Sequence, residues 1–348
     1  RYFLRMVGGV VVGSAGASLL ACGDDDDDST GGPAATPAGV QPTVAPPTTT
    51  ASVVRGGTLT FGLATEPTLG GLDANVTPAA VAHRVIQNIY DTLVTMDSDF
   101  NIIPSLASSW EISPDGKTYV FRLRDDVTFH DGTPFNAEAV KFNIDRIRDP
   151  ATKSYYSIVL LGPIDTVTVI DPQTVQFDFK APFAPFLDYA SQSFLGMVSP
   201  AAVQKFGASY ADNPVGTGPF MFKEWVKQSR ITLVRNPNYT WGSSVYKHSD
   251  AAYLDEVIFR FIPESSTRTG ALQSGEVDLI ESVFPVDVEK LRGGDTFVAS
   301  ALSPGSPFVL QLNQSKPPFN DLAVRKAFLH GVDRKGLITA LYNDVYEL

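Results

Sequence analysis

The residues of this chain that could carry chemistry are few, and their spacing fits none of the common catalytic or metal-binding motifs. The chain has four histidines in neither HExxH nor HxH spacing: His83, His130, His248 and His330. Without such a pair on one helix or strand, a histidine metal site is not indicated. No GxSxG segment occurs, so a nucleophile elbow is not indicated either. We therefore predict no metal, no cofactor, no catalytic residue and no enzyme activity.

One glycine-rich run, Gly216-Thr217-Gly218-Pro219, has the composition of a phosphate loop but lacks the downstream Gly-Lys-Ser/Thr. Without that lysine and hydroxyl the run does not meet the requirements of a nucleotide loop. A tight backbone turn is the favoured interpretation, and a ligand cradle is the alternative. His130 follows a phenylalanine and precedes Asp131-Gly132, so we expect it to hydrogen-bond a turn.

The charge balance excludes one large class of partners. The chain carries 38 acidic and 27 basic residues, a formal net charge of −11. Nucleic-acid binding depends on clustered positive charge, so we predict no nucleic-acid partner. The 43% hydrophobic content is ordinary for a globular protein and suffices for more than one lobe with its own core.

The first 53 residues are typical of an export signal and a tether. Arg1 and Arg5 precede an uncharged run from Met6 to Ala21, which is shorter than the ~20 residues of a membrane-spanning helix. We predict a signal peptide over 1–21. Arg1 to Arg5 also resembles the second half of a twin-arginine motif, so the Sec and twin-arginine export routes both stay open.

The only cysteine of the chain, Cys22, follows Leu19-Leu20-Ala21, an order that resembles the lipobox of bacterial lipoproteins. The resemblance implies that Cys22 carries a lipid; a plain signal peptide with a chance cysteine is the alternative. Residues 22–53 contain an acidic run and then a Thr/Pro/Ala/Gly stretch without hydrophobic periodicity. We predict a lipidated, disordered tether over 22–53 that anchors the protein to the outside of the cell membrane.

The remaining chain mixes strands and helices without strict βαβ alternation, which predicts a loose α/β class. Alternating or continuous apolar residues predict strands at 58–63, 118–124, 175–179, 231–234, 257–261 and 308–312. Capping residues predict helices that begin at Thr77-Pro78, Asn136, Ser265 and Asp321. The first helix would bury Val81, Val85, Ile89 and Leu93, and Gly275 would end the third.

Four blocks in this chain resemble the oligopeptide/dipeptide/nickel class, family 5, of extracellular solute-binding proteins of ABC transporters. The first block runs from Trp110 through Ser113-Pro114-Asp115-Gly116 to Val140, and the second contains Pro214 to Phe220 and Arg235 to Tyr239. The third and fourth are Leu272 to Asp278 and Leu312 to Arg334. Their order matches that of the family, which makes a chance likeness hard to sustain.

The resemblance implies a periplasmic-binding-protein-like fold with two lobes and an inserted subdomain. Lobe one would comprise 54–94 and 186–265, the inserted subdomain 95–185, and the start of lobe two 266–348. Since family members are considerably longer, we expect the chain to be incomplete, with the second lobe truncated at the C-terminus.

The same resemblance suggests where a ligand would bind. Such proteins enclose a solute between concave lobes and often hold peptides through backbone hydrogen bonds. For the candidates Tyr155 and Tyr156 the alternative interpretation is packing on the surface. For the candidate Phe308 it is a position in the core. Arg325 forms either a structural ion pair or part of the cleft lining, and Asn313 is expected to hydrogen-bond a strand end. The candidate ligand-binding residues are Thr77, Pro78, Ala79, Ala80, Tyr155, Tyr156, Ser282, Val283, Phe284, Phe308 and Gln311.

The function implied is that of a monomeric, lipid-anchored binding protein that captures a peptide-like solute by lobe closure and delivers it to ABC permease subunits. Alternatives within the class are a nickel chelate, haem or an oligosaccharide as ligand, or a solute sensor. A secreted, lipid-anchored hydrolase is a remote alternative, because no paired nucleophile and base is apparent.

Overall fold

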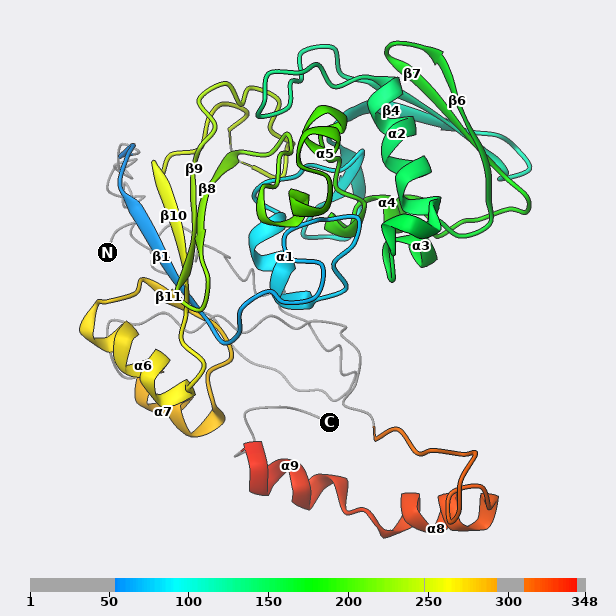
Figure 1. The fold of residues 1–348 in the computed structure, drawn as a ribbon. Helices are drawn as coiled ribbons and strands as arrows, with labels where there is room; N and C mark the ends of the chain where they lie inside the picture. The colour runs from blue at the N-terminus through cyan, green and yellow to red at the C-terminus, as the bar shows by residue number, and fades with distance from the viewer. Residues whose placement is uncertain (1–53, 247, 293–309, 343–348) are drawn as a thin grey trace, which may run out of the picture. The chain divides into compact units, whose positions relative to one another are not determined.

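The computed structural model describes residues 54–246, 248–292 and 310–342, and Cys22 with the predicted signal and tether lies outside them. The expected mixture of strands and helices is confirmed (Figure 1). The strands are β1 (Thr58–Leu63), β2 (Val94–Met96), β3 (Ile102–Pro104), β4 (Ala107–Ile112), β5 (Thr118–Leu123), β6 (Ile164–Asp171), β7 (Thr174–Phe179), β8 (Phe220–Val226), β9 (Arg230–Arg235), β10 (Glu256–Phe261) and β11 (Leu279–Ile280). The α-helices are α1 (Ala80–Ile86), α2 (Ala137–Arg148), α3 (Ser157–Leu160), α4 (Phe186–Ala190), α5 (Pro200–Phe206), α6 (Ser265–Ser274), α7 (Pro285–Arg292), α8 (Leu322–Gly331) and α9 (Arg334–Tyr342).

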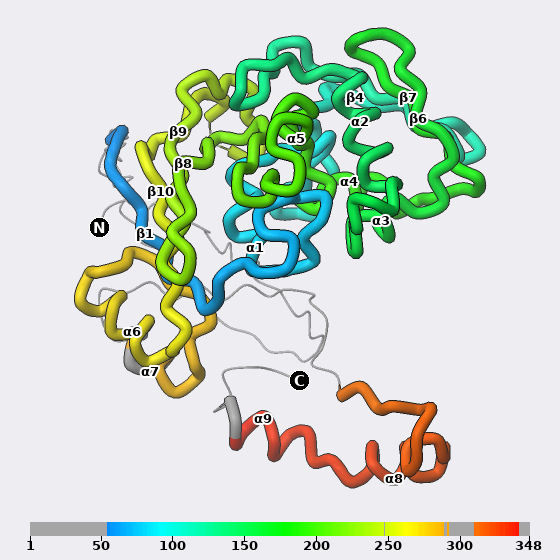
Figure 2. The backbone as a smooth tube through the Cα atoms, viewed as in Figure 1, coloured from blue at the N-terminus to red at the C-terminus, as the bar shows by residue number. Residues whose placement is uncertain are grey.

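The larger sheet joins segments that are far apart in the sequence. Its strand order is β11-β1-β10-β9-β8, and β1 runs parallel to both of its neighbours. The pairs Thr58↔Glu256 and Leu63↔Phe261 mark the two ends of the β1–β10 ladder. Figure 2 shows the chain leaving β1 for α1 and returning to the same sheet much later through β8, β9 and β10.

A second, four-stranded sheet has the order β4-β5-β7-β6 and is antiparallel throughout. All its strands fall within 107–179, a stretch that the sequence assigns to the inserted subdomain. Helix α2 packs on β6 and β7. Asn136 caps this helix as predicted, since its side chain accepts a hydrogen bond from the Ala139 amide at 3.0 Å. The apolar stripe of α2 is buried: Val140, Ile144 and Ile147.

Two separate apolar cores support these sheets. The core of the larger sheet includes Leu63, Val85, Ile89 and Phe259. The core of the antiparallel sheet is rich in phenylalanine, where Phe121, Phe177 and Phe186 pack edge to face or tilted, with centroids 5.2 to 6.1 Å apart. Buried aromatic pairs of this kind add about 0.5–1.5 kcal/mol beyond their buried area. Each sheet is thus stabilised mainly by its own layer of side chains.

The prediction that one helical stripe runs from Val81 to Leu93 is wrong. Helix α1 ends at Ile86, and Ile89 and Leu93 are buried in two different cores. The helix stops because the next carbonyls serve another segment: Asn88 accepts from the Phe220 amide at 3.0 Å and Ile89 from the Gly218 amide at 2.8 Å. These carbonyls pair with strand-like backbone and are unavailable for a further helical turn.

Helix α6 begins and ends almost where the sequence places it. Gly275 closes it in the left-handed conformation at φ 75°, as predicted. Its N-cap, however, is Glu264, one residue before the predicted Ser265: the Glu264 carboxylate accepts from the Thr267 amide at 2.9 Å. A carboxylate one residue earlier reaches the same free amide and adds a favourable charge at the helix start.

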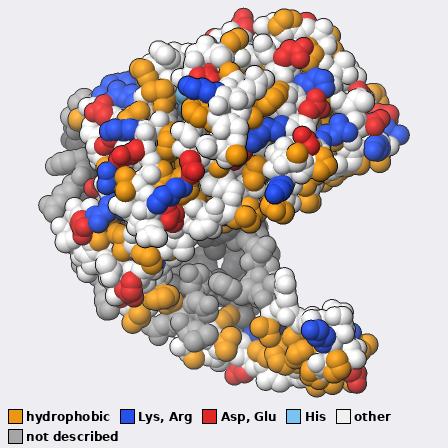
Figure 3. Space-filling model, in the orientation of Figure 1, with side chains coloured by type: hydrophobic (Ala, Val, Ile, Leu, Met, Phe, Trp, Pro, Cys, Tyr) orange, Lys and Arg blue, Asp and Glu red, His pale blue; other side chains and the backbone are white. Residues whose placement is uncertain are grey.

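Residues 310–342, taken by themselves, contain α8 and α9. The strand predicted at 308–312 is not formed in its described part, 310–312, and Phe308 lies outside the described residues. Asp321 caps α8 as predicted, accepting from the Ala323 amide at 2.7 Å. Figure 3 shows apolar side chains gathered over these helices. The large apolar side chains of the two helices with the highest exposed fraction are Leu322, Leu329 and Leu337. Among the described residues no helix is both long and apolar enough to span a bilayer.

Candidate functional site

The segment before helix α1 holds the first group of predicted ligand-binding residues. Contrary to the prediction, Thr77 is not the N-cap of the helix. Its hydroxyl instead donates to the Leu69 carbonyl at 2.9 Å. The Thr77 hydroxyl oxygen also accepts from the Ala79 amide at 3.3 Å. The helix therefore begins only at Ala80, with Ala79 as an N-cap that offers no side-chain hydrogen bond. Thr77 is fully buried, so its hydroxyl shapes the loop before α1 and does not face solvent.

A tight turn fixes this loop. Gly70 has φ 74°, and a Cβ there would lie 2.7 Å from the backbone nitrogen of Thr77. Only glycine adopts this conformation at such close approach without strain. The turn thus sets the direction in which Pro78, Ala79 and Ala80 enter α1.

One side of α1 carries an aromatic cluster. His83 hydrogen-bonds the Ser193 hydroxyl through Nδ1, and its ring lies 3.5 Å from that of Phe194 between centroids. Phe194 in turn contacts Tyr156 edge to face, at 4.5 Å. Burial, assisted by the neighbouring Arg84 charge, lowers the pKa of His83 to about 4, so the imidazole is neutral at pH 7. Among the described residues, its buried Nε2 has no hydrogen-bond partner.

The loop with Tyr155 and Tyr156 is tied to the segment before α1. The Ser154 hydroxyl donates to the Asn75 carbonyl at 2.6 Å, and the Ser157 hydroxyl donates to the Phe194 carbonyl at 2.9 Å. Between these anchors, Tyr155 is 58% exposed and Tyr156 is 40% exposed. Rings of this size, held by a fixed backbone and open to solvent, are suitable contacts for an apolar ligand group.

The next residue of α1, Arg84, makes a charged contact. Arg84 Nε donates to Glu281 at 3.1 Å, and the second carboxylate oxygen of Glu281 accepts from the Ala64 amide at 3.4 Å. Ser282 follows directly, with a left-handed backbone at φ 54°. Val283 is half-buried and Phe284 is 58% exposed. The ion pair thus brings the start of the Ser282–Phe284 loop next to α1.

The structure therefore connects three of the predicted segments to one short helix: residues 77–80 lead into α1, Tyr156 reaches it through Phe194 and His83, and Ser282 through Glu281 and Arg84. Gln311 lies in the separate segment 310–342 and is not placed against α1. Phe308 and Cys22 lie outside the described residues. Ligand binding by all these residues stays a prediction.

The Gly216–Pro219 run is a structural turn packed on the end of α1. A Cβ on Gly216 would lie 2.2 Å from the Ile89 carbonyl oxygen, and one on Gly218 would lie 2.6 Å from that of Asn88. His130 binds this turn, as expected for it, with Nε2 donating to the Gly218 carbonyl at 2.9 Å. Backbone this close to backbone leaves no room for a ligand, so the cradle alternative is not supported.

A buried carboxylate, which the sequence did not single out, joins this turn to the two aromatic residues that follow β9. Asp91 accepts hydrogen bonds from the Thr217 hydroxyl at 3.1 Å and from Tyr239 Oη and Trp241 Nε1, both at 3.2 Å. Burial raises the pKa of Asp91, while these three donors oppose the shift. In the sequence Asp91 is simply an aspartate within the predicted stripe 81–93, and that position does not reveal partners more than 120 residues away.

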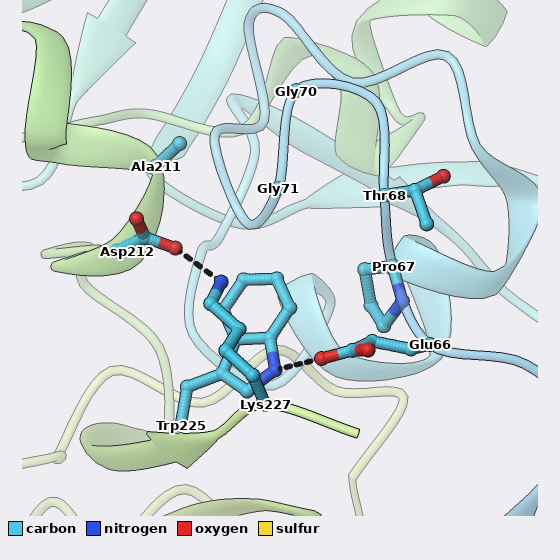
Figure 4. A pocket seen from close by; sticks show the side chains of 9 residues that line it. All are labelled: Glu66, Pro67, Thr68, Gly70, Gly71, Ala211, Asp212, Trp225 and Lys227. Carbon is cyan, nitrogen blue, oxygen red and sulfur yellow. Dashed lines mark hydrogen bonds and ion pairs between the residues drawn. The ribbon is translucent and has the colours of Figure 1, made fainter.

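The described residues also form two surface pockets. The first, of about 390 Å³, contains one hydrogen bond and one ion pair: Trp225 Nε1 donates to the Glu66 carboxylate at 2.7 Å, and Lys227 pairs with Asp212 at 2.5 Å (Figure 4). The second, of about 440 Å³, lies between α2 and α5. Neither includes a predicted ligand-binding residue. The first is lined by Glu66, Pro67, Thr68, Gly70, Gly71, Ala211, Asp212, Trp225 and Lys227.

The ionisable groups of the described residues form no metal-binding cluster, since no group of three or more His, Cys, Asp or Glu side chains converges there.

Two other predicted contacts can be placed. Arg325 donates to the Phe319 carbonyl at 2.6 Å, within segment 310–342. The prediction that Asn313 hydrogen-bonds a strand end is wrong, because residues 310–312 form no strand; its side chain instead accepts from the Ser315 amide at 3.0 Å, as in a turn. The arrangement around α1 offers exposed aromatic rings and one ion pair, which are means of binding.

Comparison with known proteins agrees with this description. Residues 101–348 match the family described as bacterial extracellular solute-binding proteins, family 5 middle, which is well over half of the chain. The glutathione-binding protein GsiB of Escherichia coli O1:K1 is 32% identical over 284 residues, 79% of this chain and 52% of that protein. The chain thus spans about half the length of the curated relatives it matches.

Two solved structures extend the likeness to the fold. The periplasmic binding protein DppA from Helicobacter pylori, in complex with the peptide STSA, has a TM-score of 0.72 and 34% identity, over 83% of this chain and 59% of that one. NikZ from Campylobacter jejuni, in complex with Ni(L-His), has a TM-score of 0.69 and 25% identity, over 82% and 55%. The fold is that of the periplasmic binding proteins. Together with the family match, these relations show that the chain belongs to family 5 of the bacterial extracellular solute-binding proteins.

Proposed function

We propose that this chain is part of a solute receptor that captures a small peptide-like molecule outside the cytoplasm and delivers it to the permease of an ABC importer. The observation that carries the proposal is the convergence on α1 of the segment 77–80, the Tyr156 cluster and the Glu281–Ser282 loop. A fixed set of aromatic and polar contacts around a helix suits binding without bond making or breaking. We propose no catalytic activity for this protein.

The ligand class follows from the relatives and from the chemistry at α1. GsiB is named for glutathione, and DppA was solved with a tetrapeptide, so two similar proteins take short peptides. Near α1, Tyr155 and Tyr156 supply apolar surface, while Arg84 and Glu281 supply both charge signs. Short peptides carry both kinds of group. A nickel chelate is the second candidate, favoured by the likeness to NikZ.

The mechanism proposed is lobe closure. A ligand that makes more contacts in the closed state than in the open one shifts the population towards closure. Residues 54–94 and 186–265 would form lobe one with 95–185 as its inserted subdomain, and lobe two would begin after it. The sheet content is consistent with this division, apart from β11, which pairs with β1 although it falls in 266–348.

Titration calorimetry tests the binding proposal. The natural protein that contains this sequence is titrated with reduced glutathione, the peptide Ser-Thr-Ser-Ala and the nickel–histidine chelate. We expect a peptide to bind with micromolar or tighter affinity, and Tyr156→Ala to weaken it at least tenfold. The control is Ile170→Ala, which removes an apolar side chain on β6 that is 54% exposed, against 40% for Tyr156. Binding of none of the three solutes, or equal affinity in both variants, contradicts the proposal.

We also propose that Cys22 is lipidated and anchors the receptor to the outside of the cell membrane. The support is its position after Leu19-Leu20-Ala21 and the uncharged run before it. Mass spectrometry of the mature N-terminal peptide should show a diacylglyceryl group on Cys22, and Cys22→Ser should release the protein from the membrane fraction. An unmodified thiol at Cys22 would refute the anchor and leave the binding proposal intact.

A further inference from the structure

Arg268 is a buried cation that binds backbone from two different segments. It lies in α6 and is only 3% exposed. Its Nη1 donates to the carbonyls of Ile262 at 2.7 Å and Pro263 at 2.8 Å. Its Nε donates to the Glu281 carbonyl at 3.2 Å, and its Nη2 to the Ser282 carbonyl at 2.8 Å. Among the described residues no carboxylate pairs with it.

Four carbonyl oxygens explain how a guanidinium is tolerated in this position. Taking a charged group out of water costs several kcal/mol unless hydrogen bonds satisfy it. The planar fork of arginine spreads its donors in fixed directions, so one side chain can serve acceptors on two strands of backbone. Lysine, with a single nitrogen, cannot reach both. The environment thus requires the shape of arginine in addition to its charge.

The two segments that Arg268 binds are the chain leaving the larger sheet and the chain coming back to it. Ile262 and Pro263 directly follow β10, whereas Glu281 and Ser282 directly follow β11. Between them the chain forms α6, on which Arg268 itself lies. One side chain therefore links the beginning and the end of the segment 262–282.

The returning segment is also fixed to β1. The Asp278 amide donates to the Thr60 carbonyl at 2.9 Å and the Glu281 amide to the Gly62 carbonyl at 3.3 Å. The Asp278 carboxylate accepts from the Thr60 amide at 2.8 Å. Because β11 has only two residues, these few bonds would open easily without a further support.

We propose that Arg268 is the positioning residue that fastens residues 278–282 to lobe one, so that lobe one extends through Ser282 and any lobe movement begins after it. The statement rests on the proposed binding function for the meaning of the lobes. Ser282, the last residue held by Arg268, has a left-handed backbone, a costly conformation for a non-glycine residue that persists where its surroundings impose it. The exposed Phe284 follows immediately, so Arg268 also sets the origin of the loop predicted to meet the ligand.

Hydrogen exchange of individual amides tests this without any ligand. In the natural protein that contains this chain, Arg268→Lys and Arg268→Met should speed exchange of the Asp278 and Glu281 amides at least tenfold. The Arg235 amide, bonded to the Asp255 carbonyl at 2.9 Å elsewhere in the same sheet, should change less than twofold. Failure of lysine to rescue distinguishes the fork from simple charge.

The matched control is Thr269→Val, the next residue of α6. Thr269 is 4% exposed, and its hydroxyl has no hydrogen-bond partner among the described residues, so its removal should leave both amides at wild-type rates. Equal acceleration of all three amides in the Arg268 variants, or wild-type exchange at Asp278 and Glu281, overturns the assignment. Either result leaves the solute titration unaffected, and a failed titration leaves the exchange result standing.

Discussion

The imidazole of His130 bridges both sides of one glycine turn: Nε2 donates to the Gly218 carbonyl at 2.9 Å, while Nδ1 accepts from the Gly216 amide at 3.4 Å. This pattern requires the neutral ring, because a protonated Nδ1 cannot accept. Burial lowers the pKa of His130 to about 4, against the raising effects of the Gly218 hydrogen bond and the Asp131 charge. The turn is therefore held by a histidine that must stay uncharged.

Stability should consequently fall in mild acid. The folded-state pKa of His130 lies below the usual 6.5, so the unfolded chain binds the proton better. The contribution of neutral His130 to the free energy of unfolding is complete above pH 6.5 and is lost as the pH falls towards 4. We expect the free energy of unfolding to drop by about 2 kcal/mol from pH 7.5 to pH 5 through His130. Urea unfolding at the two pH values measures it.

His83 has a pKa lowered in the same direction, so it adds to the effect. The control for the assignment is His130→Gln, which keeps hydrogen-bonding groups and does not titrate. Its stability should be lower overall, with a smaller decrease between pH 7.5 and pH 5. An unchanged decrease in this variant would show that His130 is not the group responsible.

Gly216 should tolerate no side chain. Its Cβ would lie 2.2 Å from the Ile89 carbonyl oxygen, which is fixed by its hydrogen bond to Gly218. We expect Gly216→Ala to lower the free energy of unfolding by about 3 kcal/mol or to prevent folding. Gly270→Ala is the control, since nothing lies within 4 Å of its Cβ, and in the interior of α6 it should stabilise by about 0.5–1 kcal/mol. Denaturant unfolding of both variants separates the outcomes, and equal effects would argue against the close packing.

The buried ion pair between Arg146 and Asp73 should be essential for stability. The two side chains are 13% and 5% exposed and lie 2.5 Å apart, and Arg146 also donates to Asn75 at 2.9 Å. Arg146→Met leaves a buried carboxylate without its partner, which typically costs about 3–5 kcal/mol. The comparison is Lys141→Met, which breaks an exposed pair with Asp145 and should cost less than about 0.5 kcal/mol. Similar losses in urea unfolding for the two variants would be inconsistent with this difference.

Residues 54–348 in isolation should bind solute weakly. The chain spans about half the length of the curated relatives, and closure needs contacts from two lobes. We expect at least 100-fold weaker affinity for a peptide than in the longer natural protein, if that protein extends beyond this sequence. Calorimetry with the same peptide compares the two, and tight binding by residues 54–348 would place the whole site within them.

Local signals in the sequence were sufficient for much of the fold. Asn136 and Asp321 lie before apolar helical stripes, and the structure uses both as caps. Gly275 ends α6 because the left-handed conformation there costs glycine little. The alternating residues of 58–63 form β1 as predicted. Each of these features depends on neighbours within a few positions.

What the sequence could not supply depends on distant partners. Thr77 has the composition of an N-cap, yet its hydroxyl is used by Leu69, so the helix starts later. The two-residue strand β11 exists only because β1 lies beside it. Around α1, Tyr156 is connected through Phe194, a residue with no distinctive local pattern. The candidate site was therefore assembled by resemblance, and its internal contacts became visible only in three dimensions.

The position of β1 between β11 and β10 has a consequence for how the protein is made. Both of its neighbours, β10 and β11, are synthesised nearly 200 residues or more after it. The strand at 58–63 must therefore wait, unpaired, while the whole antiparallel sheet at 107–179 is produced and can collapse on its own phenylalanine core. Strand β1, the first strand that the structure describes, is thus expected to be among the last to become native. Until then its unpaired edge can form incorrect contacts, which a chaperone would need to prevent.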